Sequence, residues 1–292
     1  MTPRADFPAL TLRAAALAAL AACALLLQAC GGGSGDAGTP ATSASTVTGV
    51  AFDRLSYGRL STFTVTGTNL ATAVSFSASG CDSLAMLAGG TVTQQMFTCT
   101  PNKALSVGVG ASVSGSAIFT GAALPVPKPR VTLTTSLGSV VVELEPAATP
   151  LTVDNFLAYV NAGFYNGTIF HRVISGFVVQ GGGFTSSGAT PAGLRAAIAL
   201  ESNKGLSNLR GTIAMARLDD PQFNSATSQF FFNSVDNKFL DYVSAVKPQY
   251  AVFGHVVGAS DLATIDVISA KPTDTNDKPV TDVVLQIATQ TL

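Results

Sequence analysis

Side chains that could perform covalent or acid–base chemistry are few in this chain, and their arrangement excludes several classes of active site. No Gly-x-Ser-x-Gly segment is present to expose a nucleophilic serine. The run Gly181-Gly182-Gly183 lacks the Lys-Ser/Thr pair that completes a phosphate-binding loop, so we expect a tight turn there. The two histidines, His171 and His255, are far apart in the sequence, which argues against a metal site.

One permanent cation, Arg172, stands among aromatic and apolar residues. It follows Phe170 and His171 and precedes the segment Phe177-Val-Val-Gln180. Taken alone, Arg172 would be interpreted as a solvated surface charge and Phe177 as a core aromatic. The sequence blocks around Arg172 and Phe177 favour a functional role for both residues instead.

Four blocks of sequence surround these residues and occur in a fixed order. They are GFYNGTIFHRVISGFVVQGGGF at 163–184, GTIAMA at 211–216, SATSQFFFN at 225–233 and YAVFGHV at 250–256. In order and spacing they resemble the signature of the cyclophilins, which are peptidyl-prolyl cis-trans isomerases, and the likeness is greatest to the bacterial periplasmic members. The resemblance covers residues 129–292.

The resemblance implies a role for each matching residue. Arg172 corresponds to the arginine that donates to the proline nitrogen, and Gln180 to the glutamine that bonds the substrate carbonyl and holds the arginine. His171 lies at the groove edge and completes the expected catalytic set. The expected substrate-binding residues are Phe177, Val178, Ala216, Arg217, Gln229, Phe231, Leu240 and Tyr250.

The implied reaction needs neither nucleophile, base, metal nor cofactor. The barrier to X-Pro rotation is close to 20 kcal/mol, because amide resonance is lost as the C–N bond twists. A donor aimed at the proline nitrogen stabilises the twisted state selectively. The alternative is a non-catalytic proline-peptide binder or chaperone on the cell envelope, and a pure binder has no need of Arg172.

The loop Arg217-Leu-Asp-Asp-Pro-Gln-Phe223 carries two acidic residues beside the expected groove. We hypothesise that they favour substrates with basic residues flanking the proline. The binding partners that the resemblance implies are proline-containing polypeptides.

Hydrophobic patterns predict the elements that position these residues. Residues 131–144 alternate as a β-hairpin. Thr149-Pro150 predicts the start of a helix that ends at Gly163, and a second helix follows Gly258. Short β-runs at 169–173, 177–180, 212–216, 229–233, 251–257 and 283–288 favour a closed barrel. The resemblance implies a mainly β fold, with eight antiparallel strands and two capping helices.

The first thirty residues resemble a bacterial lipoprotein signal. Residues 1–29 combine a weakly basic start with an apolar run, and Leu27-Gln-Ala-Cys30 resembles a lipobox. A plain signal peptide with an incidental cysteine is the alternative. We expect acylation (palmitate among the chains) at Cys30, a flexible tether over 30–45, and a membrane-anchored protein facing the periplasm. Gly31 resembles the outer-membrane sorting pattern.

The remaining cysteines suggest a disulfide. Cys23 would leave with the signal and Cys30 would carry lipid, so Cys81 and Cys99 remain. Two cysteines left in an exported protein indicate one disulfide bond between them. The alternative is that both are buried free thiols.

Residues 46–124 are rich in Thr, Ser, Val and Gly and show short alternating runs, which predict a small β-rich domain loosely resembling the immunoglobulin-like IPT/TIG type. Residues 125–128 begin a proline linker to the region 129–292. The net charge is −1 with no basic stripe, so we expect no nucleic-acid binding. A monomer is expected.

Overall fold

The computed structural model describes residues 44–70 and 74–292. The predicted signal peptide, the predicted lipidation site Cys30 and the tether up to residue 43 lie outside the described residues. Among the residues that are described, no helix is both long and apolar enough to cross a membrane.

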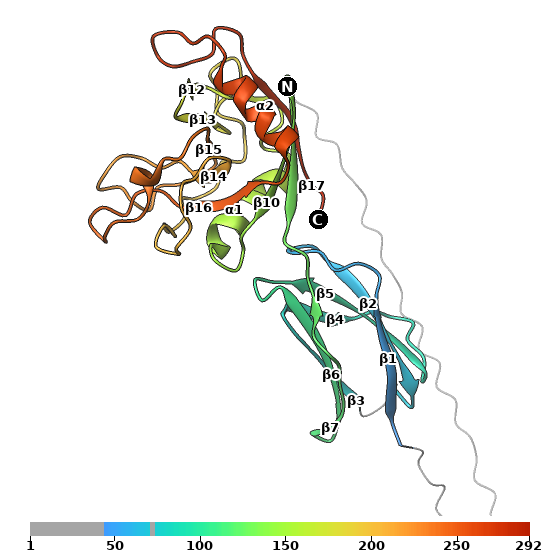
Figure 1. The fold of residues 1–292 in the computed structure, drawn as a ribbon. Helices are drawn as coiled ribbons and strands as arrows, with labels where there is room; N and C mark the ends of the chain where they lie inside the picture. Colours follow the sequence, from blue (N-terminus) through green and yellow to red (C-terminus); the bar gives the residue numbers. More distant parts are fainter. Residues whose placement is uncertain (1–43, 71–73) are drawn as a thin grey trace, which may run out of the picture. The chain divides into compact units, whose positions relative to one another are not determined.

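The described residues between 46 and 125 form eight strands in two antiparallel sheets (Figure 1). The first sheet has the order β1-β2-β5-β4, and the second has the order β3-β6-β7 with β8 paired to β6. The strands are β1 Thr46–Phe52, β2 Ser61–Thr68, β3 Val74–Ser79, β4 Cys81–Met86, β5 Gln94–Pro101, β6 Ser106–Val113, β7 Ser116–Thr120 and β8 Leu124–Pro125. Alternate residues of β5 are buried, including Phe97, which stacks on Phe63 at 5.2 Å. This arrangement is that of a small β-rich region, as the alternating runs predicted.

Cys81 and Cys99 are joined as a disulfide, with their Cα atoms 5.5 Å apart. The bridge links β4 to β5 within one sheet. The predicted pairing is therefore present in the structure.

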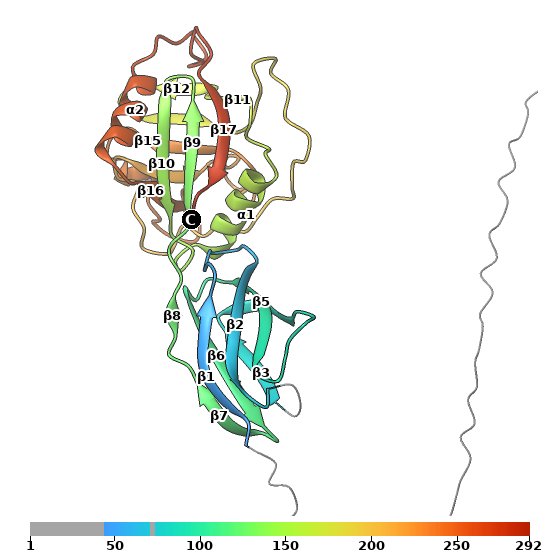
Figure 2. The same ribbon diagram turned by 90° about the vertical axis from the view of Figure 1, so that its right-hand side faces the viewer.

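The second half of the chain forms one curled sheet with two helices. Its strand order is β11-β17-β9-β10-β16-β14-β15-β13-β12, and all pairs are antiparallel. The strands are β9 Arg130–Thr135, β10 Gly138–Leu144, β11 Thr168–Ile169, β12 Arg172–Ile174, β13 Val178–Gly181, β14 Thr212–Met215, β15 Phe230–Asn233, β16 Val252–Val256 and β17 Val284–Gln290. The two α-helices are α1 Pro150–Asn161 and α2 Ala259–Ser269, and a short 3-10 turn, η1, spans Lys238–Leu240. Figure 2 shows α1 beside β17 and α2 beside β10.

The sheet differs from the expected barrel in having nine strands rather than eight. The run 169–173, predicted as a single strand, is split because the chain changes partners at Phe170 and His171. On one side β11 pairs with β17, and on the other β12 pairs with β13. The two ends of the sheet are thus joined by these two residues of chain.

Helix α1 packs one apolar stripe inward. Val153, Phe156, Leu157 and Val160 are all buried. Gly163 follows the helix with φ +69°, a conformation that suits glycine, and Phe164 N–H donates to the Tyr159 carbonyl.

The start of α1 differs in one detail from the expected cap. Thr149 occupies the N-cap position, but its hydroxyl donates to the Glu145 carbonyl instead of capping the helix. The cap comes from Glu201, a buried carboxylate that accepts from Thr152 N–H and Thr152 Oγ1, both at 2.8 Å. A negative charge at a helix N-terminus is favourable, so a residue distant in sequence fixes this end of α1.

Strand alternation divides the sheet into two apolar layers. In β15, Phe230 and Phe232 belong to the main core, whereas Phe231 packs in a second cluster with Val178, Ala214, Leu240 and Val252. Because successive side chains of a strand point to opposite faces, β13, β14, β15 and β16 each supply both layers. The second cluster forms the floor of the site described below.

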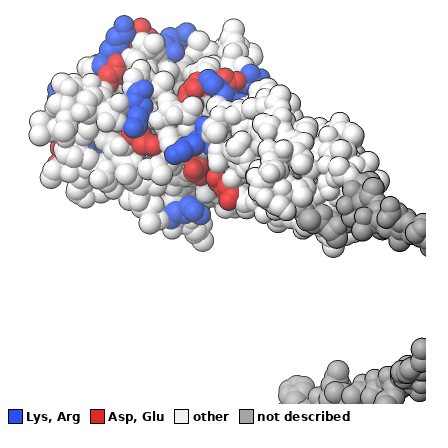
Figure 3. Space-filling view, turned by 90° about the horizontal axis from the view of Figure 1, so that it is seen from below, with Lys and Arg blue, Asp and Glu red and all other residues white. Residues whose placement is uncertain are grey.

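Charged side chains are sparse on the surface. The face in Figure 3 shows Lys and Arg interspersed with Asp and Glu on a largely uncharged surface. This view agrees with a composition of 11% charged residues and a net charge of −1.

Candidate active site

A single row of paired residues crosses four strands at the centre of the site. Arg172 of β12 pairs with Gln180 of β13, and Gln180 pairs with Phe231 of β15. Phe231 in turn pairs with Ala214 of β14. Directly paired residues share one face of a sheet, so backbone register alone brings the cation, the amide and the aromatic ring together.

Polar contacts fix the Arg172 side chain. Its Nη1 donates to Gln180 Oε1 at 3.3 Å, and Gln180 Nε2 donates to Gln229 Oε1 at 3.0 Å. On another side, Arg172 Nε lies 3.8 Å from Asp277 Oδ2. The Arg172 side chain keeps 39% of its surface exposed, so a ligand in the pocket can reach the guanidinium.

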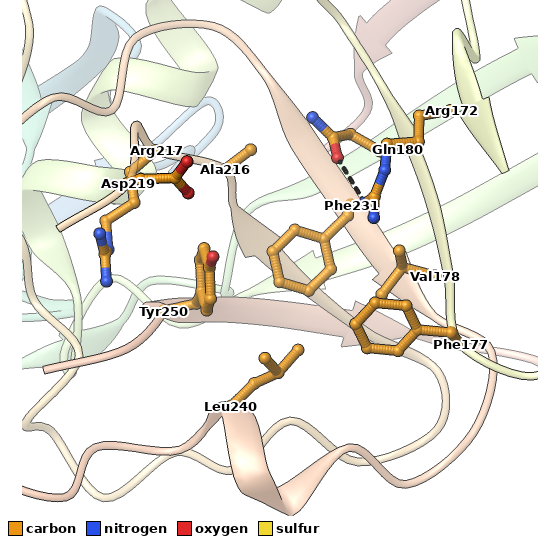
Figure 4. Close-up of a pocket in the computed structure, with 10 residues that line it drawn as sticks. All are labelled: Arg172, Phe177, Val178, Gln180, Ala216, Arg217, Asp219, Phe231, Leu240 and Tyr250. Carbon is orange, nitrogen blue, oxygen red and sulfur yellow. Dashed lines mark hydrogen bonds between the residues drawn. The ribbon is translucent and has the colours of Figure 1, made fainter. Parts of the chain in front are cut away.

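Arg172 and Gln180 border a pocket of about 250 Å³ whose walls are about equally polar and apolar (Figure 4). Phe177 stacks on Phe239 at 5.7 Å, and Phe231 makes an edge contact with Tyr250 at 5.5 Å. The residues that line the pocket are Arg172, Phe177, Val178, Gln180, Ala216, Arg217, Asp219, Phe231, Leu240 and Tyr250. The pocket therefore joins an apolar recess to a fixed cationic donor.

Arg217, one of the expected substrate-binding residues, uses its side chain for contacts within the protein. Its side chain is 3% exposed and lies 5.0 Å from the centre of the Tyr250 ring. Nε donates to the Gln249 carbonyl at 2.8 Å, Nη1 to the Leu218 carbonyl at 2.7 Å, and Nη2 pairs with Asp220 at 2.8 Å. The guanidinium thus anchors the following loop.

Ala216 can offer a bound peptide its carbonyl oxygen. Its N–H already donates to the Gln229 carbonyl at 2.9 Å. Gln229 is outside the pocket lining and supports the site through this bond and through its contact with Gln180.

His171, the third residue expected in the catalytic set, does not line the pocket. Its ring contacts Phe184 edge-on at 4.9 Å, and its Nδ1 is buried without a hydrogen-bond partner. Burial lowers the pKa of His171 below its ordinary value. The His171 ring is half-buried and packs against Phe184 outside this pocket.

Part of the glycine run forms a bend directly after β13, where a tight turn was expected. Gly182 has φ +80°, and a Cβ atom there would meet the Phe230 ring at 2.8 Å. The turn after β13 consequently has no room for a side chain at this position.

Two acidic residues at the site were not assigned individually from the sequence. Asp277 reaches Arg172 from a loop more than a hundred positions away, and no motif marks it. Asp219 lines the pocket, but the sequence alone did not distinguish it from its neighbour Asp220.

Comparison with known proteins identifies the class. The family model described as cyclophilin type peptidyl-prolyl cis-trans isomerase/CLD matches residues 130–290. The chain is 48% identical over 164 residues to peptidyl-prolyl cis-trans isomerase cyp18 of Streptomyces antibioticus, covering 54% of this chain and 96% of the relative. It is 50% identical over 145 residues to peptidyl-prolyl cis-trans isomerase A of Dickeya dadantii, covering 50% of this chain and 73% of the relative.

A third relative, peptidyl-prolyl cis-trans isomerase B of Escherichia coli, is 44% identical over 166 residues, covering 54% of this chain and 98% of the relative. With the family model matched over more than half of the chain, the protein belongs to the cyclophilin family of peptidyl-prolyl cis-trans isomerases. It is an enzyme of that class, as the four sequence blocks implied.

Proposed function

We propose that the pocket accelerates rotation of X-Pro bonds in exported polypeptides, with Arg172 as the group that stabilises the twisted amide. The observation that carries this proposal is the cross-strand row Arg172–Gln180–Phe231 at the pocket floor. The proline ring would occupy the apolar recess between Phe177, Val178, Phe231 and Leu240. The bond to be rotated would then lie beside Arg172 and Gln180.

The chemistry follows from the electronic change during rotation. In the planar amide the nitrogen lone pair is delocalised, whereas in the twisted state it is localised and accepts a hydrogen bond. A guanidinium donor in fixed position therefore binds the twisted state better than either planar state. Gln180 and Asp277 hold that donor in place, and the permanent charge of arginine requires no protonation event.

Arg172 supplies only part of the acceleration. Reaching milliseconds from about 100 s is roughly a 10⁵-fold change, or about 7 kcal/mol. A charge-assisted hydrogen bond contributes about 1.5–3 kcal/mol net. The rest would come from gripping the ring in the apolar recess and from excluding water from the amide.

The test is cis-to-trans isomerisation of an Ala-Pro peptide by the purified protein and by Arg172→Ala. We expect kcat/KM to fall about 10- to 150-fold, which corresponds to the loss of one charge-assisted bond. Arg210→Ala is the matched control, because Arg210 is similarly exposed and pairs with Asp266 outside the pocket. Equal rates for wild type and Arg172→Ala would refute the role of Arg172, and no acceleration by folded wild type would refute the activity.

We also propose that the protein is lipid-anchored at Cys30 and faces the periplasm, more specifically at the outer membrane. The lipobox-like Leu27-Gln-Ala-Cys30 and the Gly/Ser-rich tether support this proposal. Labelling with radioactive palmitate in a bacterial host should mark the wild-type chain and spare Cys30→Ser. A chain that fractionates with soluble protein and takes up no label would contradict the anchor.

A further inference from the structure

The loop that follows Arg217 places two neighbouring carboxylates in different electrostatic situations. Asp220 is neutralised, since its Oδ1 pairs with the buried guanidinium of Arg217 at 2.8 Å. Asp219 lines the pocket instead, and in the described part of the chain no cation pairs with it. Figure 4 shows its carboxylate on the Ala216 side of the pocket, opposite Phe177.

The loop is held firmly enough for this separation to persist. Arg217 donates to the Leu218 and Gln249 carbonyls and lies against the rings of Phe223 and Tyr250, at 5.4 and 5.0 Å. Leu218 N–H donates to Ser225 Oγ at 2.8 Å. These contacts fix the backbone on both sides of Asp219.

The pocket consequently has opposite charges at its two ends. Arg172 borders the end where the rotating amide would lie, and Asp219 borders the end toward which the peptide would continue past Ala216. From these contacts we infer that Asp219 is a specificity-determining residue, which selects polypeptides carrying Lys or Arg within two residues of the X-Pro bond. This inference rests on the proposed function of the pocket.

The expected selectivity is moderate because Asp219 is exposed to solvent. An exposed ion pair changes affinity by about two- to fivefold, and repulsion of a like charge is of similar size. Peptides with Lys and peptides with Glu should therefore differ by about tenfold in kcat/KM at low salt. The difference should shrink at high salt, where the Debye length falls to about 3 Å at 1 M.

The experiment uses three peptides with an Ala-Pro core and Lys, Ala or Glu on both flanks. The purified protein is compared with Asp219→Asn, which removes the charge and keeps the shape of the side chain. We expect the Lys-to-Glu ratio of kcat/KM to fall from about ten toward one in the variant. Asp266→Asn is the matched control, because it removes an exposed carboxylate outside the pocket and should keep the wild-type ratio.

The outcomes separate the inference from the proposed function. If wild type accelerates the Ala peptide but its Lys-to-Glu ratio is near one, the selectivity is refuted and the isomerase remains. A ratio that survives Asp219→Asn refutes the assignment to Asp219. Failure of wild type to accelerate the Ala peptide refutes the proposed function itself, whatever the ratio.

Discussion

At the scale of single residues, the environment of Arg172 is governed by contacts from three separate segments. Gln180 comes from the adjacent strand, Gln229 supports Gln180, and Asp277 approaches from a distant loop. The side chain is flexible and long, so these contacts reduce the entropy that a substrate would otherwise have to remove. Asp277 is thus a positioning residue that acts through Arg172.

Replacing Asp277 by Asn tests this positioning. Asn tolerates the positive φ of +62° at this position, so the backbone should persist. The pair is exposed, and we expect kcat/KM for an Ala-Pro peptide to fall about two- to fivefold with little change in Tm. High salt should bring the wild type close to the variant, and a salt-independent difference would contradict an electrostatic role.

A second prediction at this scale concerns His171 and pH. Burial lowers the pKa of His171 in the folded state, while the unfolded chain titrates near 6.5. Below about pH 6.5 the unfolded state takes up this proton and the folded state does not, so the free energy of unfolding decreases as pH falls. The stability that neutral His171 contributes is therefore present above pH 6.5, and it is lost as the pH falls through the pKa of His171 in the folded state.

Urea titrations between pH 7 and pH 5 measure this effect. We expect the pH dependence of stability to be weaker in His171→Gln than in wild type. Turnover per folded wild-type molecule should stay constant over the same range, because His171 does not line the pocket. Equal pH dependence in both proteins would show that another group is responsible.

At the scale of elements, β15 shows how one strand serves two purposes. Phe231 lines the pocket, and its neighbour Phe232 is fully buried in the main core. Adjacent positions with the same residue type therefore form a natural matched pair.

Leu substitutions at these two positions should have opposite consequences. In Phe231→Leu we expect KM for an Ala-Pro peptide to rise several-fold, because the wall of the apolar recess is lost, with modest loss of stability. In Phe232→Leu we expect a loss of about 1–3 kcal/mol in urea unfolding, with kcat/KM per folded molecule retained. Similar effects of both substitutions would mean that the strand faces are not energetically distinct.

The elements also show which parts of the site could be predicted from the sequence. The Phe-His-Arg and Phe-Phe-Phe-Asn blocks pointed to Arg172 and Phe231 through their resemblance to the cyclophilin signature, whereas strand alternation alone would not have assigned them a role. Asp277 and the Glu201 cap of α1 depend on how distant loops close, and no local pattern encodes that closure. The split of 169–173 into β11 and β12 was missed for the same reason. A change of strand partner leaves no mark in the hydrophobic pattern of the segment.

At the scale of the whole molecule, two regions have different means of stabilisation. Both regions have aromatic cores, with Phe63 and Phe97 in the first and Phe156 and Phe230 in the second, but only the sheets of residues 46–125 also contain a disulfide, Cys81–Cys99. Removing the covalent link should therefore affect the first region selectively.

The variant with both Cys81 and Cys99 replaced by Ala tests this expectation. The bridge closes a segment of 18 residues, and such a loop is worth about 3 kcal/mol. We expect an earlier thermal transition in the N-terminal sheets and unchanged kcat/KM for an Ala-Pro peptide. A parallel loss of activity at low temperature would show that the pocket depends on the first region.

The alternation of β13, β14 and β15 between main core and pocket floor has a consequence for how the protein can change over evolutionary time. Inward positions such as Val179 and Ile213 are constrained by folding, while pocket-lining positions such as Val178 and Phe231 would be constrained by a bound peptide. Mutations at the two sets are therefore subject to different selective pressures. Single substitutions on the pocket face can therefore change which polypeptides are preferred, while the residues on the core face keep the fold stable.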